Sequence, residues 1–329
     1  MDIQNDPTRN LALELVRVTE AAALASGRYM GRGDKEGADG AAVNAMRIIL
    51  QTVDMNGVII IGEGEKDNAP MLYNGENVGN GSGPDFDVAV DPIDGTRPLA
   101  FGRSNSLATV AIAPRGSMFD PGPFVYMNKL AVGPEAKGSI DIEKPITENL
   151  KAIAKAKHKD VEDLTTIVLD RPRHDKVIAE IRASGARIRL IPDGDVAGAL
   201  MTALPDSGVD VLIGIGGTPE GVIAACALRA MGGEIQGKLY ARDEDELHRG
   251  REAGYDFDKI LTMDDLVSSE DVFFTATGIT DGELLKGVRY FGDSATTDSL
   301  VVRGMTGTVR QIAATHQIDK LRQLSAVRY

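Results

Sequence analysis

Two carboxylates followed by a Gly-Thr pair are the residues of this chain best suited to chemistry. The segment Asp91-Pro92-Ile93-Asp94-Gly95-Thr96 holds its acids three residues apart, with a stiffening proline between them. The alternating run PDFDVAV before it predicts a strand that delivers both acids to one point. Mg²⁺ and Mn²⁺ prefer carboxylate, carbonyl and phosphate oxygens, and Gly95 lets the backbone approach an anion. The segment therefore indicates a divalent metal bound to a phosphate, although Asp, Pro and Gly also suit an acidic turn.

Two further segments of the first half carry charged residues. GIGEGEKD contains Glu63, Glu65 and Asp67 after a short apolar run, and alternation places Glu63 and Glu65 on one side if the strand continues. GRGDKEGADG contains Lys35 and Asp39 just before the apolar residues of an expected helix. Taken alone, the first segment also suits a solvated acidic loop, and Asp39 also suits the N-cap of that helix.

Two segments of the second half could bind a phosphate and sugar hydroxyls. In RPRHD, Arg171 and Arg173 flank Pro172 at a strand end, and an Arg fork pairs well with phosphate oxygens. In IPDGDVAG, the acids of Asp193-Gly194-Asp195 stand at the entry to a helix, where they could accept hydrogen bonds from a sugar. The alternatives are surface charge at a helix start for the arginines and helix capping for the acids.

The glycine-rich segment GIGGTPEG fits a dinucleotide-binding turn poorly. Its third glycine position is Pro219, and the usual acid about 20 residues further on is missing because position 236 is Gln. Such a turn can cradle phosphate in other ways, and Glu220 adds an acid to it. The sequence has no Walker A segment and no G-x-S-x-G elbow. None of its four histidines stands in a metal-ligand spacing with another, which favours an oxygen-only site over zinc.

The elements expected around these residues change in rhythm near the middle of the chain. The first half predicts helices over 7–31 and from near 39, then short strands at 58–61, 84–91, 107–114 and 129–134. This is an α+β pattern. The second half alternates strand and helix three times, which predicts a parallel sheet with crossover helices in an overall α/β fold.

A turn-rich stretch at 135–163 separates these two patterns. It divides the chain into an expected metal-binding domain of 1–150 and a substrate-binding domain of 151–329. Ligands of open α/β sheets bind beyond the carboxyl ends of the strands, so we expect five polar strand ends to meet in one cleft. These ends are 62–65, 91–96, 170–173, 193–195 and 214–220.

Composition limits the function classes. The 329 residues carry a net charge of −13, which argues against a general nucleic-acid surface and against binding to an anionic membrane. A small anionic substrate stays possible if metals and a few placed bases collect it. No basic segment precedes an apolar core at the start, and no apolar run approaches the ~20 residues of a membrane span. The single cysteine, Cys226, lies in an apolar run expected to be a buried helix, and we expect a cytoplasmic protein.

Taken together, these segments resemble the lithium-sensitive sugar and inositol phosphatase superfamily, for which DPIDGT is characteristic. More closely, the chain resembles the bacterial class II fructose-1,6-bisphosphatases over nearly its whole length. Several blocks in fixed order are far more specific than DPIDGT alone. The blocks are GRGDKEGADGAAVNAMR, IGEGEKDNAPMLYNGE, AVDPIDGTRPLA, YMNKLAVGP, DRPRHDKVIAEI, IPDGDVAGAL, GIGGTPEGVIAA, FFTATGIT and LLKGVRYFG. The resemblance implies a layered sugar-phosphatase fold with two sheets and helices between and outside them.

The resemblance also implies two sites for Mn²⁺ or Mg²⁺. Asp39 and Glu63 match ligands of one metal, and Asp91, Asp94 and Glu220 match ligands of the second. Many members have Glu where this chain has Asp94, whose carboxylate is one methylene shorter. The wider superfamily uses Asp there, so a working site is expected, with the metal preference open.

Further roles follow from the same resemblance. Thr96, assisted by Asp67, would orient and activate the attacking water, and Lys35 would help to hold the acidic loop or the phosphate. The remaining matches are contacts to the cleaved phosphate or to the sugar phosphate: Asp94, Gly95, Thr96, Tyr126, Arg171, Pro172, Arg173, Asp193, Gly194, Asp195 and Gly217.

The implied activity is metal-dependent hydrolysis of the 1-phosphate of fructose 1,6-bisphosphate in gluconeogenesis. A dual enzyme that also accepts sedoheptulose 1,7-bisphosphate, or an inositol-phosphate phosphatase, stays open, although the two arginines favour a bisphosphate. A sugar-nucleotide sensor without catalysis would leave the acids of the first half unexplained. The resemblance further implies a homo-oligomer, with a tetramer favoured over a dimer.

Overall fold

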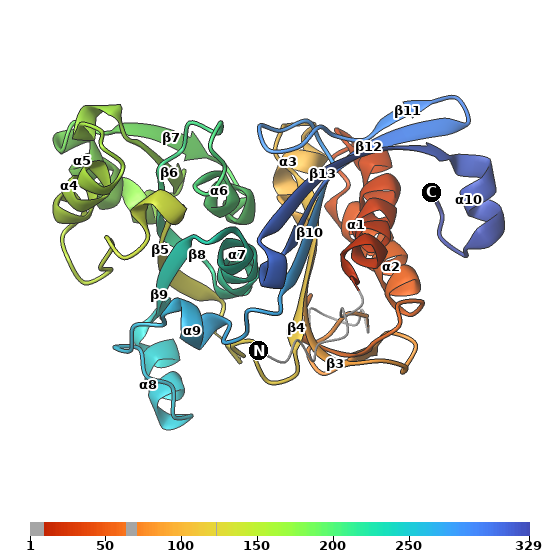
Figure 1. Ribbon diagram of the computed structural model, residues 1–329, viewed down its shortest axis with the longest axis horizontal. Coiled ribbons are helices and arrows are strands. Elements are labelled where there is room, and N and C mark those ends of the chain that lie inside the picture. The colour runs from red at the N-terminus through yellow and green to blue at the C-terminus, as the bar shows by residue number, and fades with distance from the viewer. Residues whose placement is uncertain (1–9, 64–70, 123) are drawn as a thin grey trace, which may run out of the picture.

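Five alternating layers of helix and sheet make up the computed structural model, which describes residues 10–63, 71–122 and 124–329 (Figure 1). The predicted arrangement of two sheets with helices between and outside them is confirmed. None of the helices in the described residues is long and apolar enough to span a membrane.

The larger sheet has eight strands in the order β11-β12-β10-β4-β3-β1-β2, and β13 pairs with β12. Among the described strands of this sheet, only β1 and β3 pair in parallel, so the α+β character expected of this part is confirmed. The strands are β1 (Asn56–Ile61), β2 (Asn77–Val78), β3 (Asp85–Asp94), β4 (Leu107–Pro114), β10 (Phe273–Gly278), β11 (Arg289–Phe291), β12 (Ser294–Arg303) and β13 (Thr308–Gln317).

The smaller sheet has five strands in the order β7-β6-β8-β5-β9. The predicted parallel pairing is confirmed for β6 with β7 and with β8, but β5 lies antiparallel between β8 and β9. The sheet is therefore mixed, since β5 arrives from an earlier part of the chain. Its strands are β5 (Tyr126–Val132), β6 (Thr165–Leu169), β7 (Arg187–Ile191), β8 (Val211–Gly217) and β9 (Glu234–Tyr240).

The helices form the other three layers (Figure 1). The pair α1 and α2 covers the outer face of the larger sheet, α6 and α7 lie between the sheets, and α4 and α5 cover the smaller sheet. The α-helices are α1 (Ala12–Ser26), α2 (Lys35–Leu50), α3 (Thr96–Ala100), α4 (Ile146–Ala156), α5 (Asp175–Ala183), α6 (Asp195–Met201), α7 (Thr218–Met231), α8 (Glu244–Glu252), α9 (Met263–Leu266) and α10 (Ile318–Leu324). Short 3₁₀ turns include η1 (Gly27–Tyr29), η4 (Pro172–His174) and η5 (Gly304–Thr306).

Helix α7 is apolar on all sides because it is sandwiched between the two sheets. Val222, Ile223 and Leu228 have no exposed surface, and Cys226 is buried among them as the sequence predicted. Burial raises the pKa of the Cys226 thiol to about 12. The thiol is thus a packing group rather than a nucleophile.

The start of α2 differs from the sequence prediction. The helix begins at Lys35 and is capped by Asp34, whose side chain accepts a hydrogen bond from the Gly37 amide at 2.9 Å. The alternative in which Asp39 caps this helix is therefore wrong. Asp39 lies one turn inside the helix and is only partly exposed.

Both sheets combine segments from before and after residue 150. Strand β5 precedes that point but pairs in the smaller sheet, whereas β10 to β13 follow it and pair in the larger sheet. The division into domains of 1–150 and 151–329 stays a prediction. Strand pairing within each sheet joins the two halves of the chain, and α6 and α7 pack between the two sheets.

Candidate active site

The end of β3 presents the two acids that the sequence singled out. Asp91 pairs with Thr109 of β4, and the register then shifts before Asp94. The Ile93 amide donates to the Asp91 carboxylate at 3.0 Å, which closes a local turn. Gly95 follows with φ +98°, a left-handed conformation that favours glycine, and α3 starts at once. The strand, the turn and the short helix thereby fix Asp91, Asp94 and Thr96 at the carboxyl end of β3, inside the larger sheet.

The acids there hold their protons unusually tightly. Burial raises the pKa of Asp91 well above its usual range, and the nearby carboxylates of Asp94, Glu220 and Glu63 raise it further. Burial likewise raises the pKa of Asp94, with Asp195 as the next cause. For Glu220, burial and then Asp195 raise the pKa to about 7. Acids from β3, α6, α7 and the turn after β1 thus crowd into one region of strongly negative potential.

Two oxygens of this acidic group have no hydrogen-bond donor. They are Oδ2 of Asp94 and Oε2 of Glu220, both buried. Buried carboxylate oxygens without a donor suit a hard cation, because such an ion compensates their charge. As the side chains lie, however, no three Asp, Glu, His or Cys residues of the described part are gathered in a metal-binding arrangement. The donor types fit a divalent cation.

Thr96 connects the β3 end to α2. Its hydroxyl donates to Oδ1 of Asp39 at 3.1 Å and lies 3.4 Å from the Ile93 carbonyl oxygen. Because Asp39 lies inside α2 rather than at its N-cap, its carboxylate does not cap the helix and instead contacts Thr96. The contact joins residues 57 positions apart, which the sequence alone could not pair.

A cavity of about 850 Å³ opens over these residues. Four of the five expected strand ends contribute to its wall, so the prediction that they meet in one cleft is confirmed for those four. The predicted site residues in the wall are Asp39, Glu63, Asp91, Asp94, Gly95, Thr96, Asp193, Asp195 and Glu220. The fifth end, with Arg171 and Arg173, is not part of this wall among the described residues but lies next to it, since Arg171 donates to Asp193 at 3.3 Å.

The amino-acid sequence also matches known proteins over nearly its full length. Residues 9–316 match the family model described as bacterial fructose-1,6-bisphosphatase, glpX-encoded. The chain is 49% identical over 325 residues to fructose-1,6-bisphosphatase 1 class 2 of Escherichia coli (strain K12), covering 95% of this chain and 96% of that protein. The identity and both coverages are the same for the class 2 fructose-1,6-bisphosphatases of E. coli O6:H1 and Shigella flexneri. This chain belongs to the GlpX fructose-1,6-bisphosphatase family.

In this GlpX family member, a buried histidine anchors the arginine segment. His174 is fully buried, its Nδ1 lies 2.7 Å from the Leu169 carbonyl oxygen, and its Nε2 accepts from the Ile215 amide at 2.7 Å. The proton therefore sits on Nδ1, and burial lowers the pKa of the ring. His174 therefore has a structural role. It ties η4 to the end of β8 and so positions the arginines beside the cavity.

Arg173 is held against two neighbours by that anchor. It donates twice to the Ile215 carbonyl oxygen, at 2.8 and 3.1 Å, and its guanidinium lies 5.1 Å from the centre of the Tyr126 ring. Tyr126 starts β5, directly opposite Gly217 of β8. The predicted sugar-phosphate residues of three segments thus stand close together. The positions of Pro172 and Gly194, inside η4 and just before α6, agree with this grouping.

Lys129 is a buried residue of this site that the sequence analysis missed. Its side chain is 3% exposed, forms an ion pair with Asp195 and donates to the Gly217 carbonyl oxygen at 2.9 Å. A Cβ at position 217 would overlap the Glu220 carboxylate, so Gly217 allows Glu220 to fold back here. The available signal was a lysine inside the apolar strand MNKLAV, since a buried Lys must be paired.

The other two residues predicted to be catalytic are Lys35 and Asp67. Lys35 starts α2, and its Nζ lies 5.8 Å from the centre of the Phe101 ring. Burial raises the pKa of Asp193. The charge of Arg171 opposes this rise, and the charge of Lys35 opposes it to a smaller extent. Asp67 lies outside the described residues.

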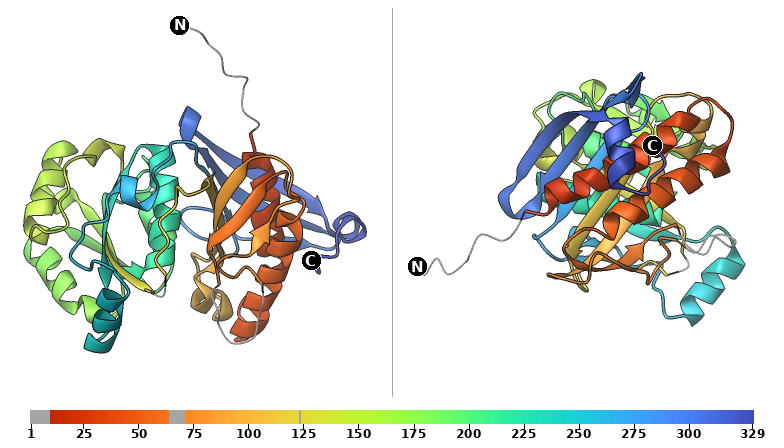
Figure 2. Two further views of the ribbon diagram at one scale, coloured as in Figure 1. Left: turned by 90° about the horizontal axis from the view of Figure 1, so that it is seen from below. Right: turned by 90° about the vertical axis from the view of Figure 1, so that its right-hand side faces the viewer.

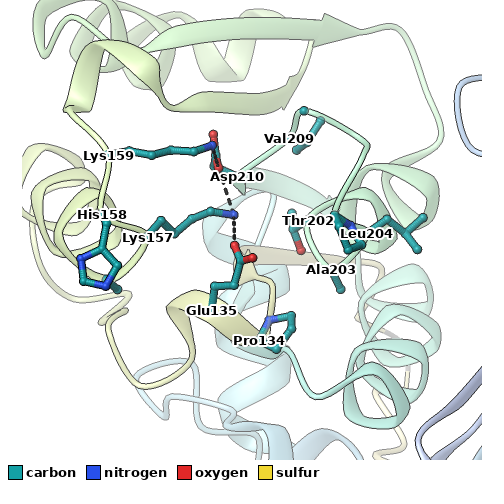
Figure 3. Close-up of a pocket in the computed structure, with 13 residues that line it drawn as sticks. Pro134, Glu135, Lys157, His158, Lys159, Thr202, Ala203, Leu204, Val209 and Asp210 are labelled. Carbon is teal, nitrogen blue, oxygen red and sulfur yellow. Dashed lines mark hydrogen bonds and ion pairs between the residues drawn. The ribbon is translucent and has the colours of Figure 1, made fainter.

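A second cavity of about 380 Å³ lies on the smaller sheet, at the end of α4 (Figure 3). Lys157 points into it and pairs with Glu135 at 2.9 Å and with Asp210 at 3.0 Å, and Lys159 also pairs with Asp210 at 2.7 Å. These charges neutralise one another. The acidic cavity, where Lys129 and Arg171 pair with Asp195 and Asp193 but like charges still raise the pKa values of Asp91, Asp94 and Glu220, is the candidate active site.

Proposed function

We propose that this chain hydrolyses the 1-phosphate of fructose 1,6-bisphosphate, giving fructose 6-phosphate and inorganic phosphate, and that it serves gluconeogenesis. Its family membership and the names of its 49%-identical relatives support this activity. The observation that carries the proposal is the convergence of Asp91, Asp94 and Glu220, whose pKa values are raised by burial and then by neighbouring carboxylates. Such a cluster lowers the stability of the fold, but it is well suited to bind a cation and a phosphate.

We propose Mn²⁺ or Mg²⁺ as the cofactor, at two sites. Asp39 and Glu63 would hold one ion, and Asp91, Asp94 and Glu220 would hold the other. The unpaired oxygens of Asp94 and Glu220 support the second set. When bound, the cations supply charge neutralisation for the phosphate, a lower pKa for bound water and stabilisation of the leaving oxygen.

Thr96 is the residue proposed to orient the attacking water. Because its hydrogen is directed to Asp39, the lone pairs of its Oγ1 remain able to accept a hydrogen bond from that water. The water oxygen then forms a bond to phosphorus while the bond between phosphorus and O1 of the sugar breaks, and a proton ends on O1. Asp67 is proposed to assist and Lys35 to hold the acidic loop or the phosphate. The segment 94–96 would contact the phosphate being cleaved.

The second phosphate is proposed to lie near the arginine segment. Arg171 and Arg173 stand beside the acidic cavity, with Tyr126 against Arg173. The sugar would lie between them and the acids, in contact with Asp193, Gly194, Asp195 and Gly217. A chain of net charge −13 can bind a tetra-anion in this way because cations meet one phosphate and arginines the other.

The test is phosphate release from a panel of sugar phosphates with Mg²⁺, Mn²⁺ or EDTA. Fructose 1,6-bisphosphate should be hydrolysed in the presence of either cation, EDTA should stop the reaction, and Asp91→Ala should abolish it. Comparable turnover of sedoheptulose 1,7-bisphosphate would make the enzyme dual. Preference for an inositol phosphate, or no phosphate release at all, would reject the proposal.

We also propose a cytoplasmic homo-oligomer, with a tetramer favoured over a dimer, that acts on a small-molecule sugar bisphosphate and binds neither nucleic acid nor membrane. The negative charge supports the last two points. The single buried cysteine fits a reducing compartment.

A further inference from the structure

Strand β13 leaves one long edge of the larger sheet without a partner. It pairs with β12 over all ten of its residues, in an unbroken antiparallel register, and with no other strand of the described chain. In the right-hand view of Figure 2 the two strands run along the border of the molecule. A free edge of this length presents a row of backbone donors and acceptors.

The register shows which backbone groups point outward. The Ile318 amide donates to the Asp293 carbonyl oxygen, and these residues extend the ladder in which Gln317 faces Ser294. Because inward and outward groups alternate along an antiparallel strand, the even-numbered residues bond to β12. The amides and carbonyls of Val309, Gln311, Ala313, Thr315 and Gln317 therefore point away from the sheet. The same five side chains are exposed.

This edge lacks the features with which proteins protect edge strands. At other sheet edges, β2 has only two residues, and β7 carries Arg187 and Arg189. β13 has no proline, no lysine and no bulge, and its one fully charged residue is Arg310. Val309 is 42% exposed and Met305, in the preceding turn, is 60% exposed. The edge is thus open to pairing rather than protected against it.

Charge indicates what would pair there. The chain has 49 acidic residues, yet none lies in the twenty positions 299–318, which contain Arg303 and Arg310. Two copies of a chain with net charge −13 repel each other over most of their surface. A contact through the acid-free strand keeps the acids of the two copies apart.

We infer that β13 pairs with β13 of a second copy of this chain, antiparallel about a two-fold axis at Ala313. This rests on the proposed homo-oligomer and names its contact strand. In this register Ala313 faces its own copy, Gln311 faces Thr315, and Val309 faces Gln317. All five outward residues then exchange both backbone groups, which gives about ten hydrogen bonds and joins the two larger sheets. None of the five outward residues of β13 carries a charge, and Asp298 of β12, which lies opposite Ala313, is buried and accepts from the Gln311 side chain.

Ala313→Pro tests the pairing on the full chain. Because the amide of Ala313 points outward, proline removes a bond between copies and none to β12, and it favours an extended residue before it. Wild type should have at least twice the 35.0 kDa mass of one chain by sedimentation or light scattering, and the variant half the wild-type mass. Ala313→Val keeps the amide and should keep the wild-type mass. A single cooperative thermal transition would show that Ala313→Pro still folds.

Amide hydrogen exchange provides the second readout. In wild type the amides of 309, 311, 313, 315 and 317 should exchange slowly, and all except the missing amide at 313 should exchange fast in Ala313→Pro. The even-numbered amides should stay slow in both. A wild-type monomer would reject both the homo-oligomer and this surface. An oligomer whose mass Ala313→Pro leaves unchanged would reject the surface alone, and slow odd amides in a monomer would show that something other than a second copy covers the edge.

Discussion

At the scale of single residues, the site is a set of acids that destabilise the folded protein when no cation compensates their charge. Asp94 is buried, Asp91 and Glu220 are partly exposed, and all three have raised pKa values because burial and like charges oppose their ionisation. Lys129 forms an ion pair with Asp195, and its charge opposes the rise in the pKa of Glu220, which burial and Asp195 nevertheless raise. Residues that cost stability and converge in one cavity are typical of catalytic sites.

Thr96→Ala should lower kcat about 100-fold or more, in the range of a lost proton-transfer or water-orienting group. Metal affinity should change little, because the hydroxyl bonds to Asp39 through a single hydrogen bond. Steady-state kinetics and metal titration of the same variant check both statements. Thr96→Ser retains the hydroxyl and is the matched control. A near wild-type kcat in Thr96→Ala would remove the water-orienting role.

Arg173→Ala should mainly raise KM for a bisphosphate and leave KM for a monophosphate nearly unchanged. The reason is that Arg173 stands against Tyr126 and, unlike the acids of β3, does not line the acidic cavity. Arg173→Lys keeps the charge but loses the fork that bonds twice to Ile215. Its KM for the bisphosphate should therefore lie between those of wild type and Arg173→Ala. Equal losses on both substrates would contradict the assignment to the distal phosphate.

At the scale of elements, strand ends and the turns after them bring the site together. The turn between β3 and α3 places Asp91, Asp94 and Thr96, and His174 locks η4 onto β8. A further buried polar group joins α1, β12 and β13. Thr297 donates to Glu20 at 3.3 Å, and His316 Nε2 lies 2.8 Å from the Thr297 hydroxyl.

Glu20 predicts a pH dependence of stability. Burial raises its pKa from 4.5 to about 7, so the folded protein holds this proton more tightly than the unfolded chain. The resulting stabilisation is complete below about pH 4.5 and is lost as the pH rises through about 7. Glu20→Gln mimics the protonated form and should lack this loss, a difference of up to about 3 kcal/mol by pH 8.

Denaturant unfolding between pH 4.5 and 8 measures that difference. Glu14→Gln, on the same helix but paired with Arg17 at the surface, is the matched control and should keep the wild-type pH dependence. Parallel pH curves for wild type and Glu20→Gln would show that Glu20 titrates normally in the folded protein.

At the scale of the whole molecule, the five layers bring groups from distant parts of the chain to one cavity. Asp39 comes from the outer helix layer, Asp91 and Asp94 from the larger sheet, and Glu220 from the helix between the sheets. The repulsion among these acids therefore acts across layers. A cation bound by them would hold the layers together.

Metal removal should consequently lower the thermal stability of the entire protein. A ligand that binds only the folded state at 100 times its Kd contributes about 2.7 kcal/mol. Calorimetry of the protein with EDTA and then with Mn²⁺ or Mg²⁺ should show a rise in Tm on adding metal. Asp91→Asn should show a smaller rise, and in EDTA it should be at least as stable as wild type because one buried negative charge is gone. An equal rise in both proteins would exclude Asp91 as a ligand.

The sequence by itself determined the parts of this protein that depend on neighbouring residues. Alternation and glycine turns indicated β3, β4 and the three strand–helix repeats, and the apolar run around Cys226 indicated the buried α7. The tertiary structure decided which of these parts meet. The bond between Thr96 and Asp39, the ion pair between Lys129 and Asp195, the insertion of β5 into the smaller sheet and the cap at Asp34 rather than Asp39 all depend on partners or competition that local patterns do not encode. The reason is physical, since the period of apolar residues fixes a secondary structure, whereas long-range pairing depends on how whole layers pack.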